Sequence, residues 1–504
     1  MIRMTDDGHP TPTGARSGAR TGVGARFGGL VREHPRASLV TAGALALVLF
    51  GGGALAAGAA TGGGTPTAAG APTSSVRPST RATAAAPAAK PTATSRPTPS
   101  SIPAASPLRT CSVAAAAADS RLGTFEGTVL NATTGETLFD RNGKTPSRTG
   151  SVMKTLTTAV ALSVLGPDYR FTTKVTGTGG SIALVGGGDP TLSALPAGSE
   201  SVYTGAPKLS DLAAQVKTKL GATPVTSIDL DSTMWNNADA WDPSWPVTER
   251  TIGYQPLIVP LMVDGDRANP QLETSPRSVD PVGRAGDAFR QALVNAGVVG
   301  ASTAPITRAA ATSTTVLGQV QSQPISTLIG QMIPNSDNTL AEMMARVSSK
   351  VSGSNGSAAS LTSVYRAALS KTYGLDSSTL TIIDGSGESY NDAVPSAFEA
   401  ALMVKVLSRV DSLGLLYDVL PISGQTGTLA ARFTGANAIA RGAVHAKTGW
   451  IASAYTLGGV IDAKDGTKLT FAFYAIGNVT ASAMQALDTL TTAVYTCGNN
   501  LSDQ

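Results

Sequence analysis

The feature that most constrains the fold is a set of strand-like runs divided between two distant parts of the chain. Gly135 separates the first two runs, and Asp465-Gly466, a pair typical of tight hairpins, separates the last two. We therefore expect an α/β (α+β) domain with one largely antiparallel five-stranded sheet, assembled from both ends of the region and flanked by helices. The five runs are 125–132, 136–140, 442–448, 454–461 and 468–476.

Helical patterns surround these runs, and a stretch of different composition interrupts them. Residues 172–312 are rich in Gly, Thr, Ser and short β-like runs, which indicates an inserted, mostly-β domain. The catalytic domain would then consist of residues 108–171 and 313–504. Its predicted helices cover 112–121, Ser151 to Leu165 before Gly166-Pro167, a helical stretch within 325–350, and 480–496.

The N-terminal residues indicate export. Residues 1–36 are rich in Arg, Gly, Ser and Thr and predict a disordered cytoplasmic tail. Residues 37–60 carry no charge and are long enough to span a bilayer, so we favour an uncleaved membrane anchor. A cleaved signal peptide is the alternative, because Ala54-Leu55-Ala56 resembles a cleavage site. Residues 61–107 read as a Pro/Ala/Thr/Ser-rich linker, and either alternative places the catalytic domain outside the cytoplasm.

The charge distribution excludes one class of partner. Residues 1–107 hold 10 basic and 3 acidic residues, whereas residues 108–504 hold 28 basic and 31 acidic residues. The exported part is therefore mildly acidic and has no basic stripe, so we expect no nucleic-acid partner.

Histidine and cysteine usage narrows the chemistry further. His445 is the single histidine after residue 60, which excludes zinc motifs that need paired histidines, and a lone histidine in a strand is usually structural. No metal or cofactor is expected. Cys111 and Cys497 lie at the two ends of the predicted domain, which predicts one disulfide in an exported protein and argues against a cysteine nucleophile. A serine nucleophile with a lysine base remains.

Ser151-Val152-Met153-Lys154 is the single SxxK motif in the chain. Residues three apart on a helix share a face, so the Lys154 amine can reach the Ser151 hydroxyl. Backbone N–H groups at the start of a helix favour developing negative charge at Ser151. Because about one SxxK is expected by chance in a chain of this composition, the motif needs support from elsewhere.

Two further motifs give that support. Lys447-Thr448-Gly449 is the single K-[ST]-G, on a predicted strand, where a cation and a hydroxyl suit a substrate carboxylate and Gly449 permits close backbone approach. Ser336-Asp337-Asn338 is an SxN element ahead of a helical run. Ser389-Tyr390-Asn391 is a second copy, but it lies beside a loop that reads as flexible, so Ser336 is preferred.

In the order SxxK, SxN, KTG, these motifs resemble the penicillin-recognising serine enzymes, the penicillin-binding proteins and serine β-lactamases. The 181 residues between Lys154 and Ser336 fit an inserted domain. Together with three further segments they resemble the D-alanyl-D-alanine carboxypeptidase/endopeptidase family of class C low-molecular-mass penicillin-binding proteins, peptidase family S13. The segments are Gly186-Gly187-Gly188-Asp189-Pro190-Thr191-Leu192, Asp384-Gly385-Ser386-Gly387 and Gly427-Thr428-Leu429.

The resemblance implies a penicillin-binding/β-lactamase-like fold and a set of roles. Ser151 would attack a D-Ala-D-Ala carbonyl of a peptidoglycan stem peptide, Lys154 would act as base, and Ser336 would pass a proton to the leaving amine. Substrate contacts are implied for Asn338, Lys447, Thr448 and Gly449, an oxyanion hole for the N–H groups of Ser151 and Trp450, and inhibition by β-lactams. Trp450 and Glu388 depart from the family pattern, since Thr or Ser and leucine, respectively, are common at these positions.

Alternatives remain at this point. A serine β-lactamase shares the motifs but has a much shorter interval between the first two. A catalytically silent cell-wall-binding protein and a general serine esterase are the others. Carboxypeptidase and endopeptidase preference are not separated by the sequence.

Overall fold

The computed structural model of the chain describes residues 108–503. The tail predicted at 1–36, the apolar segment at 37–60 and the linker at 61–107 lie outside these residues. Within the described part, none of the helices combines the length and the apolar character needed to cross a membrane.

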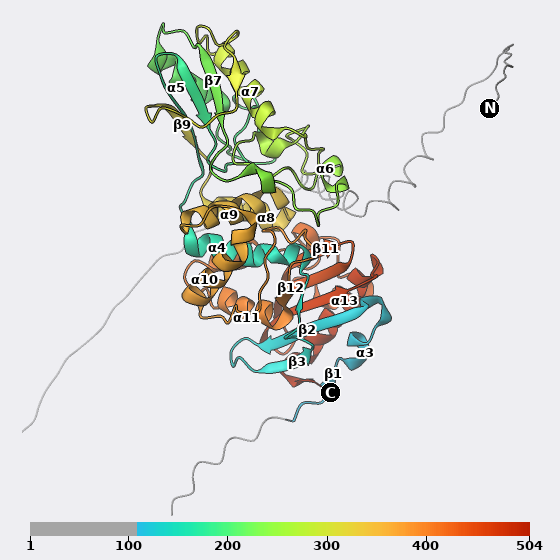
Figure 1. Cartoon of the computed structure of the whole chain (residues 1–504). Helices are drawn as coiled ribbons and strands as arrows, with labels where there is room; N and C mark the ends of the chain where they lie inside the picture. Colours follow the sequence, from blue (N-terminus) through green and yellow to red (C-terminus); the bar gives the residue numbers. More distant parts are fainter. Residues whose placement is uncertain (1–107, 504) are drawn as a thin grey trace, which may run out of the picture. The chain divides into compact units, whose positions relative to one another are not determined.

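The predicted five-stranded sheet is confirmed. All its neighbouring strands are antiparallel, in the order β11-β12-β13-β2-β3. Strands from the start of the domain therefore lie beside strands from its end, as the cyan and red arrows show in Figure 1. Their bounds are β2 Thr124–Asn131, β3 Thr137–Arg141, β11 Val444–Ile451, β12 Ala454–Asp462 and β13 Lys468–Ile476.

Helices pack on both faces of this sheet because alternate residues of a strand point to opposite sides. Phe471 and Phe473 of β13 share a core with Leu487 and Leu490 of α13 (Ser482–Cys497). The other face is covered by α11 (Ser396–Leu407), which contacts β2, β12 and β13.

Helix α4 (Met153–Val164) lies at the centre of the helical part of the domain. Ten of its 12 residues are buried, on all sides of the helix, as expected for a helix enclosed by others. It contacts α8, α9, α10 and α12, and a 3-10 turn at Gly150–Val152 leads into it. The bounds of these helices are α8 Ile325–Asn335, α9 Asn338–Val351, α10 Leu361–Tyr373 and α12 Gly414–Val419.

The insert contains a second five-stranded sheet, in the order β8-β7-β6-β5-β9. Its last strand lies beyond residue 312, where we expected the insert to end, because β9 pairs with β5. Its β6–β7 and β7–β8 pairs are parallel. Two long helices, α5 (Leu209–Leu220) and α7 (Pro281–Asn295), belong to the insert and were not expected from its Gly/Thr/Ser-rich composition. The strands are β5 Thr172–Thr178, β6 Ser181–Val185, β7 Ser227–Asp231, β8 Ile306–Thr307 and β9 Val316–Gln321, with a short α6 at Thr248–Ile252.

The start of the domain differs from the prediction. The expected helix at 112–121 is reduced to α3 (Ala114–Ala117) and a 3-10 turn at Ser120–Leu122, separated by Asp119, whose carboxylate accepts from Arg121 N. Cys111 lies before α3 in β1 (Cys111–Ser112), which pairs in parallel with β14 (Leu501–Ser502). This pairing and the contact of α3 with α13 bring Cys111 close to Cys497, and the two form a disulfide. A second short pair joins β4 (Pro146–Ser147) and β10 (Val394–Pro395).

One buried carboxyl group makes stability depend on pH. Glu399 of α11 is fully buried and accepts from Thr155 Oγ1 at 2.9 Å. Burial raises the pKa of Glu399 to about 8, against a partly opposing effect of that hydrogen bond. In the folded state, Glu399 therefore stays protonated at pH values above its ordinary pKa of 4.5. Its contribution to the free energy of unfolding is complete below that pH and is lost as the pH rises towards 8.

We expect the unfolding free energy to fall by at most about 1.4 kcal/mol per pH unit in this window because of Glu399. The isosteric Glu399→Gln variant should show a flatter dependence, measured by thermal unfolding between pH 5 and 9. Glu136→Gln, at an exposed glutamate, is the matched control. Parallel curves for wild type and Glu399→Gln would contradict the assignment.

Candidate functional site

Ser151 and Lys154 meet at the start of the buried helix. Ser151 lies in the 3-10 turn that leads into α4, and Lys154 lies in the first turn of α4 itself. Lys154 Nζ lies 2.9 Å from Ser151 Oγ, as the i,i+3 spacing predicts. Ser151 is 7% exposed and Lys154 is fully buried, so the amine approaches the hydroxyl from inside the protein.

Lys154 Nζ has two further acceptors. Asn338 Oδ1 lies at 2.7 Å and the carbonyl of Ser386 at 2.8 Å. An ammonium group has three donors and satisfies all three contacts. A neutral amine keeps two N–H groups for Asn338 and Ser386 and turns its lone pair to Ser151. The arrangement therefore accommodates both protonation states that a general base needs.

The SxN element lies where α8 ends and α9 begins. Ser336 has a left-handed backbone (φ 58°) at the end of α8, and Asp337 accepts from Leu340 N at 2.8 Å as the N-cap of α9. This break directs Asn338 to Lys154 and Ser336 to the strand β11. Lys447 Nζ donates to Ser336 Oγ at 2.8 Å and to the Thr448 carbonyl at 2.7 Å.

The three motifs are therefore linked through side chains. Lys447 is fully buried on β11, the edge strand of the sheet, and Thr448 is half-buried beside it. Thr448 Oγ1 donates to Thr428 Oγ1 at 2.8 Å, which adds the Gly427-Thr428-Leu429 segment to the site. A cation and two hydroxyl groups thus lie together at the edge of the sheet.

Two glycines allow β11 to approach the serine closely. A Cβ at Gly449 would lie 2.9 Å from Ser151 N, and a Cβ at Gly150 would lie 2.8 Å from Trp450 N. Glycine is thus required at position 449 because the turn that carries Ser151 packs against it. The sequence had instead suggested that Gly449 makes room for the backbone of a ligand. The N–H groups of Ser151 and Trp450, the expected oxyanion donors, consequently belong to two segments in direct contact.

The loop at 384–389 corrects the sequence analysis, which read it as flexible. Asp384, Ser386 and Ser389 are buried. The Asp384 carboxylate accepts from the backbone N–H groups of Ser386, Gly387 and Ser389, and Glu342 of α9 accepts from those of Gly385 and Ser386. Two buried carboxylates therefore fix the loop and present the Ser386 carbonyl to Lys154. The sequence indicates the Asp-Gly-Ser-Gly segment, but its contact with Lys154 is visible only in the structure.

The second SxN copy and the histidine lie in other surroundings. Ser389 Oγ accepts from Ser244 of the insert at 2.7 Å, and Asn391 is exposed. His445 stacks on Tyr417 with ring centroids 5.3 Å apart, and burial lowers its pKa. These contacts agree with the preference for Ser336 and with a structural role for His445. Among residues 108–503, no cluster of His, Cys, Asp or Glu that could hold a metal is found.

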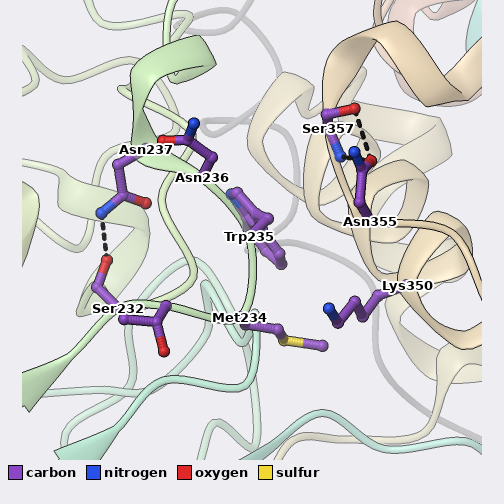
Figure 2. Close-up of a pocket in the computed structure, with 9 residues that line it drawn as sticks. Ser232, Met234, Trp235, Asn236, Asn237, Lys350, Asn355 and Ser357 are labelled. Atoms are coloured by element: carbon purple, nitrogen blue, oxygen red, sulfur yellow. Dashed lines mark hydrogen bonds between the residues drawn. The ribbon is translucent and has the colours of Figure 1, made fainter. Parts of the chain in front are cut away.

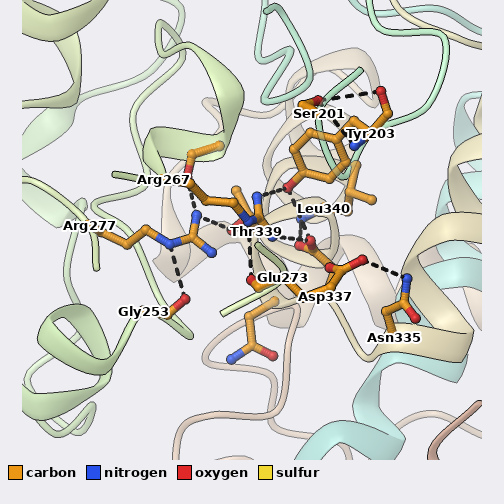
Figure 3. A network of polar contacts seen from close by, with 12 residues as sticks. Ser201, Tyr203, Gly253, Arg267, Glu273, Arg277, Asn335, Asp337, Thr339 and Leu340 are labelled. Atoms are coloured by element: carbon orange, nitrogen blue, oxygen red, sulfur yellow. Dashed lines mark hydrogen bonds and ion pairs between the residues drawn. The ribbon is translucent and has the colours of Figure 1, made fainter. Parts of the chain in front are cut away.

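The insert reaches the SxN element through a buried ion pair (Figure 3). Arg267 donates to Asp337 Oδ2 at 2.7 Å and to Tyr203 Oη at 2.7 Å, and Tyr203 donates to the same carboxylate at 3.1 Å. Burial alone would raise the pKa of Asp337, but the charges of Arg267 and Arg277 and the Leu340 N–H outweigh it and hold the pKa below its ordinary value. A second contact joins Trp245 Nε1 to Asp384 at 2.7 Å.

A cavity of about 500 Å³ lies elsewhere, between the insert and the C-terminal end of α9 (Figure 2). Ser232 and Asn237 from the insert and Lys350 and Asn355 from the catalytic domain are among its lining residues. None of the residues of the three motifs lines it.

An antiparallel five-stranded sheet, a long insert and a buried serine–lysine pair are the features of serine hydrolases of the penicillin-binding class. The profile of the D-Ala-D-Ala carboxypeptidase 3 (S13) family matches residues 110–278 and 268–494. The chain belongs to this family.

Individual relatives agree with this assignment. Carboxypeptidase DacB of Mycolicibacterium smegmatis is 33% identical over 398 residues, which cover 77% of this chain and 84% of the relative. The D-alanyl-D-alanine carboxypeptidase of Actinomadura sp. is 27% identical over 439 residues, covering 69% and 77%. The crystal structure of penicillin binding protein 4 from Haemophilus influenzae shares the fold, with a TM-score of 0.62 at 16% identity, over 76% of this chain and 99% of that chain.

Proposed function

We propose that the protein is a serine D-alanyl-D-alanine carboxypeptidase that trims peptidoglycan stem peptides through an acyl-enzyme on Ser151. The observation that carries the proposal is the set of three contacts of Lys154 Nζ, to Ser151, Asn338 and Ser386. A buried amine held against a serine hydroxyl is the activated nucleophile that acyl transfer requires. The family assignment supplies the substrate class.

In the proposed mechanism, Lys154 takes the proton of Ser151 as Oγ attacks the carbonyl of the terminal D-Ala-D-Ala bond. The N–H groups of Ser151 and Trp450 stabilise the oxyanion, a contribution of about 3–4 kcal/mol per donor in comparable enzymes. The C–N bond breaks as the proton taken by Lys154 is passed through Ser336 to the leaving amine. Water then attacks the ester carbonyl and gives a proton to Lys154. The ester C–O bond breaks, and Lys154 returns that proton to Ser151 Oγ.

Substrate orientation follows from the same contacts. Asn338 faces the acyl amide of the stem peptide, and Lys447 and Thr448 face its terminal carboxylate. A β-lactam has an amide and a carboxylate in a similar geometry, so β-lactams should inhibit the enzyme by acylating Ser151. We further propose that residues 37–60 attach the enzyme to the cell membrane, with its catalytic domain outside the cytoplasm. We propose cleavage of D-amino-acid cross-links as a second activity of the same site.

The proposal predicts a selective loss in Lys447→Ala. Hydrogen bonds to charged groups contribute about 1.5–3 kcal/mol, so kcat/KM on a D-Ala-D-Ala peptide with a free carboxylate should fall about 10- to 100-fold. The same peptide with an amidated C-terminus should change much less. The measurement is product release from both peptides, with Lys468→Ala on β13 as the control. Equal losses on the two peptides, or full activity on the free acid, would contradict the role of Lys447.

A further inference from the structure

A buried carboxylate, Glu388, lies behind the asparagine of the SxN element. Its side chain is 5% exposed, and its Oε2 accepts from Asn338 Nδ2 at 3.1 Å. Asn338 Oδ1 in turn accepts from Lys154 Nζ at 2.7 Å, and Lys154 contacts Ser151 at 2.9 Å. Glu388 is therefore connected to the nucleophile through two intervening side chains.

The carboxylate decides how the Asn338 amide is oriented. An ionised carboxylate only accepts hydrogen bonds, and an ammonium only donates them. With Glu388 on one side and Lys154 on the other, the amide has one orientation that satisfies both, with Nδ2 towards Glu388 and Oδ1 towards Lys154. The amide nitrogen has two N–H groups, so one remains for a substrate carbonyl.

Glu388 is held firmly in this position. The preceding Gly387 has φ +79°, and a Cβ there would collide with the Gly150 carbonyl and lie 2.9 Å from Met153 Cβ. The loop is thus packed against the turn that carries Ser151. Asp384 fixes the same loop through the N–H groups of Gly387 and Ser389, on both sides of Glu388.

Other ionisable groups on the elements around Lys154 have assigned partners. The carboxylates of Glu342 and Asp384 accept from loop N–H groups, Asp392 accepts from Ile383 N, and Glu399 accepts from Thr155. Asp337 pairs with Arg267, Arg277 donates to the Gly253 carbonyl, Tyr365 contacts Thr157, and Lys447 donates to Ser336. Glu342 and Asp384 accept from the backbone N–H of Ser386, whose carbonyl also contacts Lys154. Glu388 differs from these two carboxylates because it accepts from the side chain of Asn338, the amide that contacts Lys154.

We propose that Glu388 is a positioning residue that orients Asn338 and whose negative charge favours the ammonium form of Lys154. The pH at which acylation begins to accelerate is therefore higher than it would be with a neutral residue at position 388. An opposite charge nearby favours the charged form of an ionisable group. Lys154 must lose a proton before it can accept one from Ser151. The negative charge of Glu388 therefore means that the neutral amine of Lys154 forms only at a higher pH. This inference rests on the proposed function, since it concerns the same acylation.

The test compares wild type, Glu388→Gln and Glu388→Leu in the full chain. Gln keeps the shape and an acceptor for Asn338 but removes the charge, whereas Leu removes both. The second-order rate of acylation by benzylpenicillin is measured from pH 5 to 10, together with hydrolysis of a D-Ala-D-Ala peptide. Glu200→Gln, at an exposed glutamate of the insert, is the matched control.

In Glu388→Gln the rising limb of the acylation rate should move to lower pH by about 1 unit. Glu388→Leu should be about tenfold slower than Glu388→Gln at the optimum, because Asn338 loses its fixed orientation. A Glu388→Gln profile that coincides with wild type, or a folded Glu388→Leu as fast as Glu388→Gln, would overturn the inference. If wild type itself is not acylated at any pH, the proposed function fails, and this outcome is separate from the first two.

Discussion

Replacing Lys154 with methionine is expected to slow acylation of Ser151 by about 10²- to 10⁴-fold, the usual contribution of a general base. Methionine fills most of the buried volume but has no amine, so the loss reports the chemistry rather than a cavity. Lys154→Ala should lose as much activity, with an additional loss of stability, because it leaves a void in a fully buried position.

The measurement is the rate of labelling by a fluorescent penicillin, with thermal unfolding to verify the fold. Lys350→Ala, at the exposed end of α9, should label like wild type. Labelling of a folded Lys154→Met at the wild-type rate would show that another group accepts the Ser151 proton.

The second large effect is expected at the ion pair between the insert and the SxN element. Arg267 and Asp337 are 2% and 3% exposed. Removing one partner of such a pair leaves an uncompensated buried charge and usually costs about 3–5 kcal/mol. Arg267→Met should therefore lower the free energy of unfolding by about that amount. Arg409→Met breaks an exposed pair, with partners 54% and 50% exposed, and should cost about 0–1 kcal/mol.

A double variant tests the cause of this loss. In Arg267→Met/Asp337→Asn, the remaining partner is a neutral amide that can still cap Leu340 N, so part of the stability should return. Chemical denaturation of the single and double variants measures the difference. A double variant no more stable than Arg267→Met would mean that the loss comes from packing rather than from the orphaned charge.

The contacts of Arg267 with Asp337 and Tyr203 also explain what the insert contributes to the site. Asp337 lies between Ser336 and Asn338, and Arg267 therefore fixes the residue that separates these two side chains of the proposed site. Trp245 of the insert donates to Asp384 and so fixes the loop whose Ser386 carbonyl contacts Lys154. The insert therefore braces two of the segments that surround Lys154.

Local patterns in the sequence predicted the parts of the fold that depend on local physics. Strand-like runs separated by the turn signals at Gly135 and Asp465-Gly466 predicted the five strands. The i,i+3 spacing predicted the contact between Lys154 and Ser151. The Cys111–Cys497 bond followed from the positions of two cysteines in an exported domain. The length of α3 was overestimated because an alanine-rich run has high helix propensity, whereas Asp119 offers its carboxylate to a following N–H and ends the helix.

The remaining features depend on contacts between distant residues. The Ser386 carbonyl reaches Lys154 across 232 positions of sequence, and a Gly-rich segment reads as flexible until its carboxylate partners are known. Glu388 was noticed as a departure from the family pattern, but its contact with Asn338 requires the loop to fold onto the SxxK turn. The helices of the insert were missed because the composition of the whole segment was considered, whereas their own signals are local. The buried apolar residues Leu209, Leu212 and Val216 recur at helical spacing in α5, and Asp280 caps α7 ahead of Pro281.

The central claim is that Ser151 forms a covalent acyl-enzyme, and intact mass spectrometry of the protein after incubation with benzylpenicillin tests it most directly. The account predicts a stable adduct of one penicillin on wild type, located by peptide mapping to the peptide that contains Ser151, and none on Ser151→Ala. An unmodified, folded wild-type protein, or an adduct on a peptide without Ser151, would contradict it.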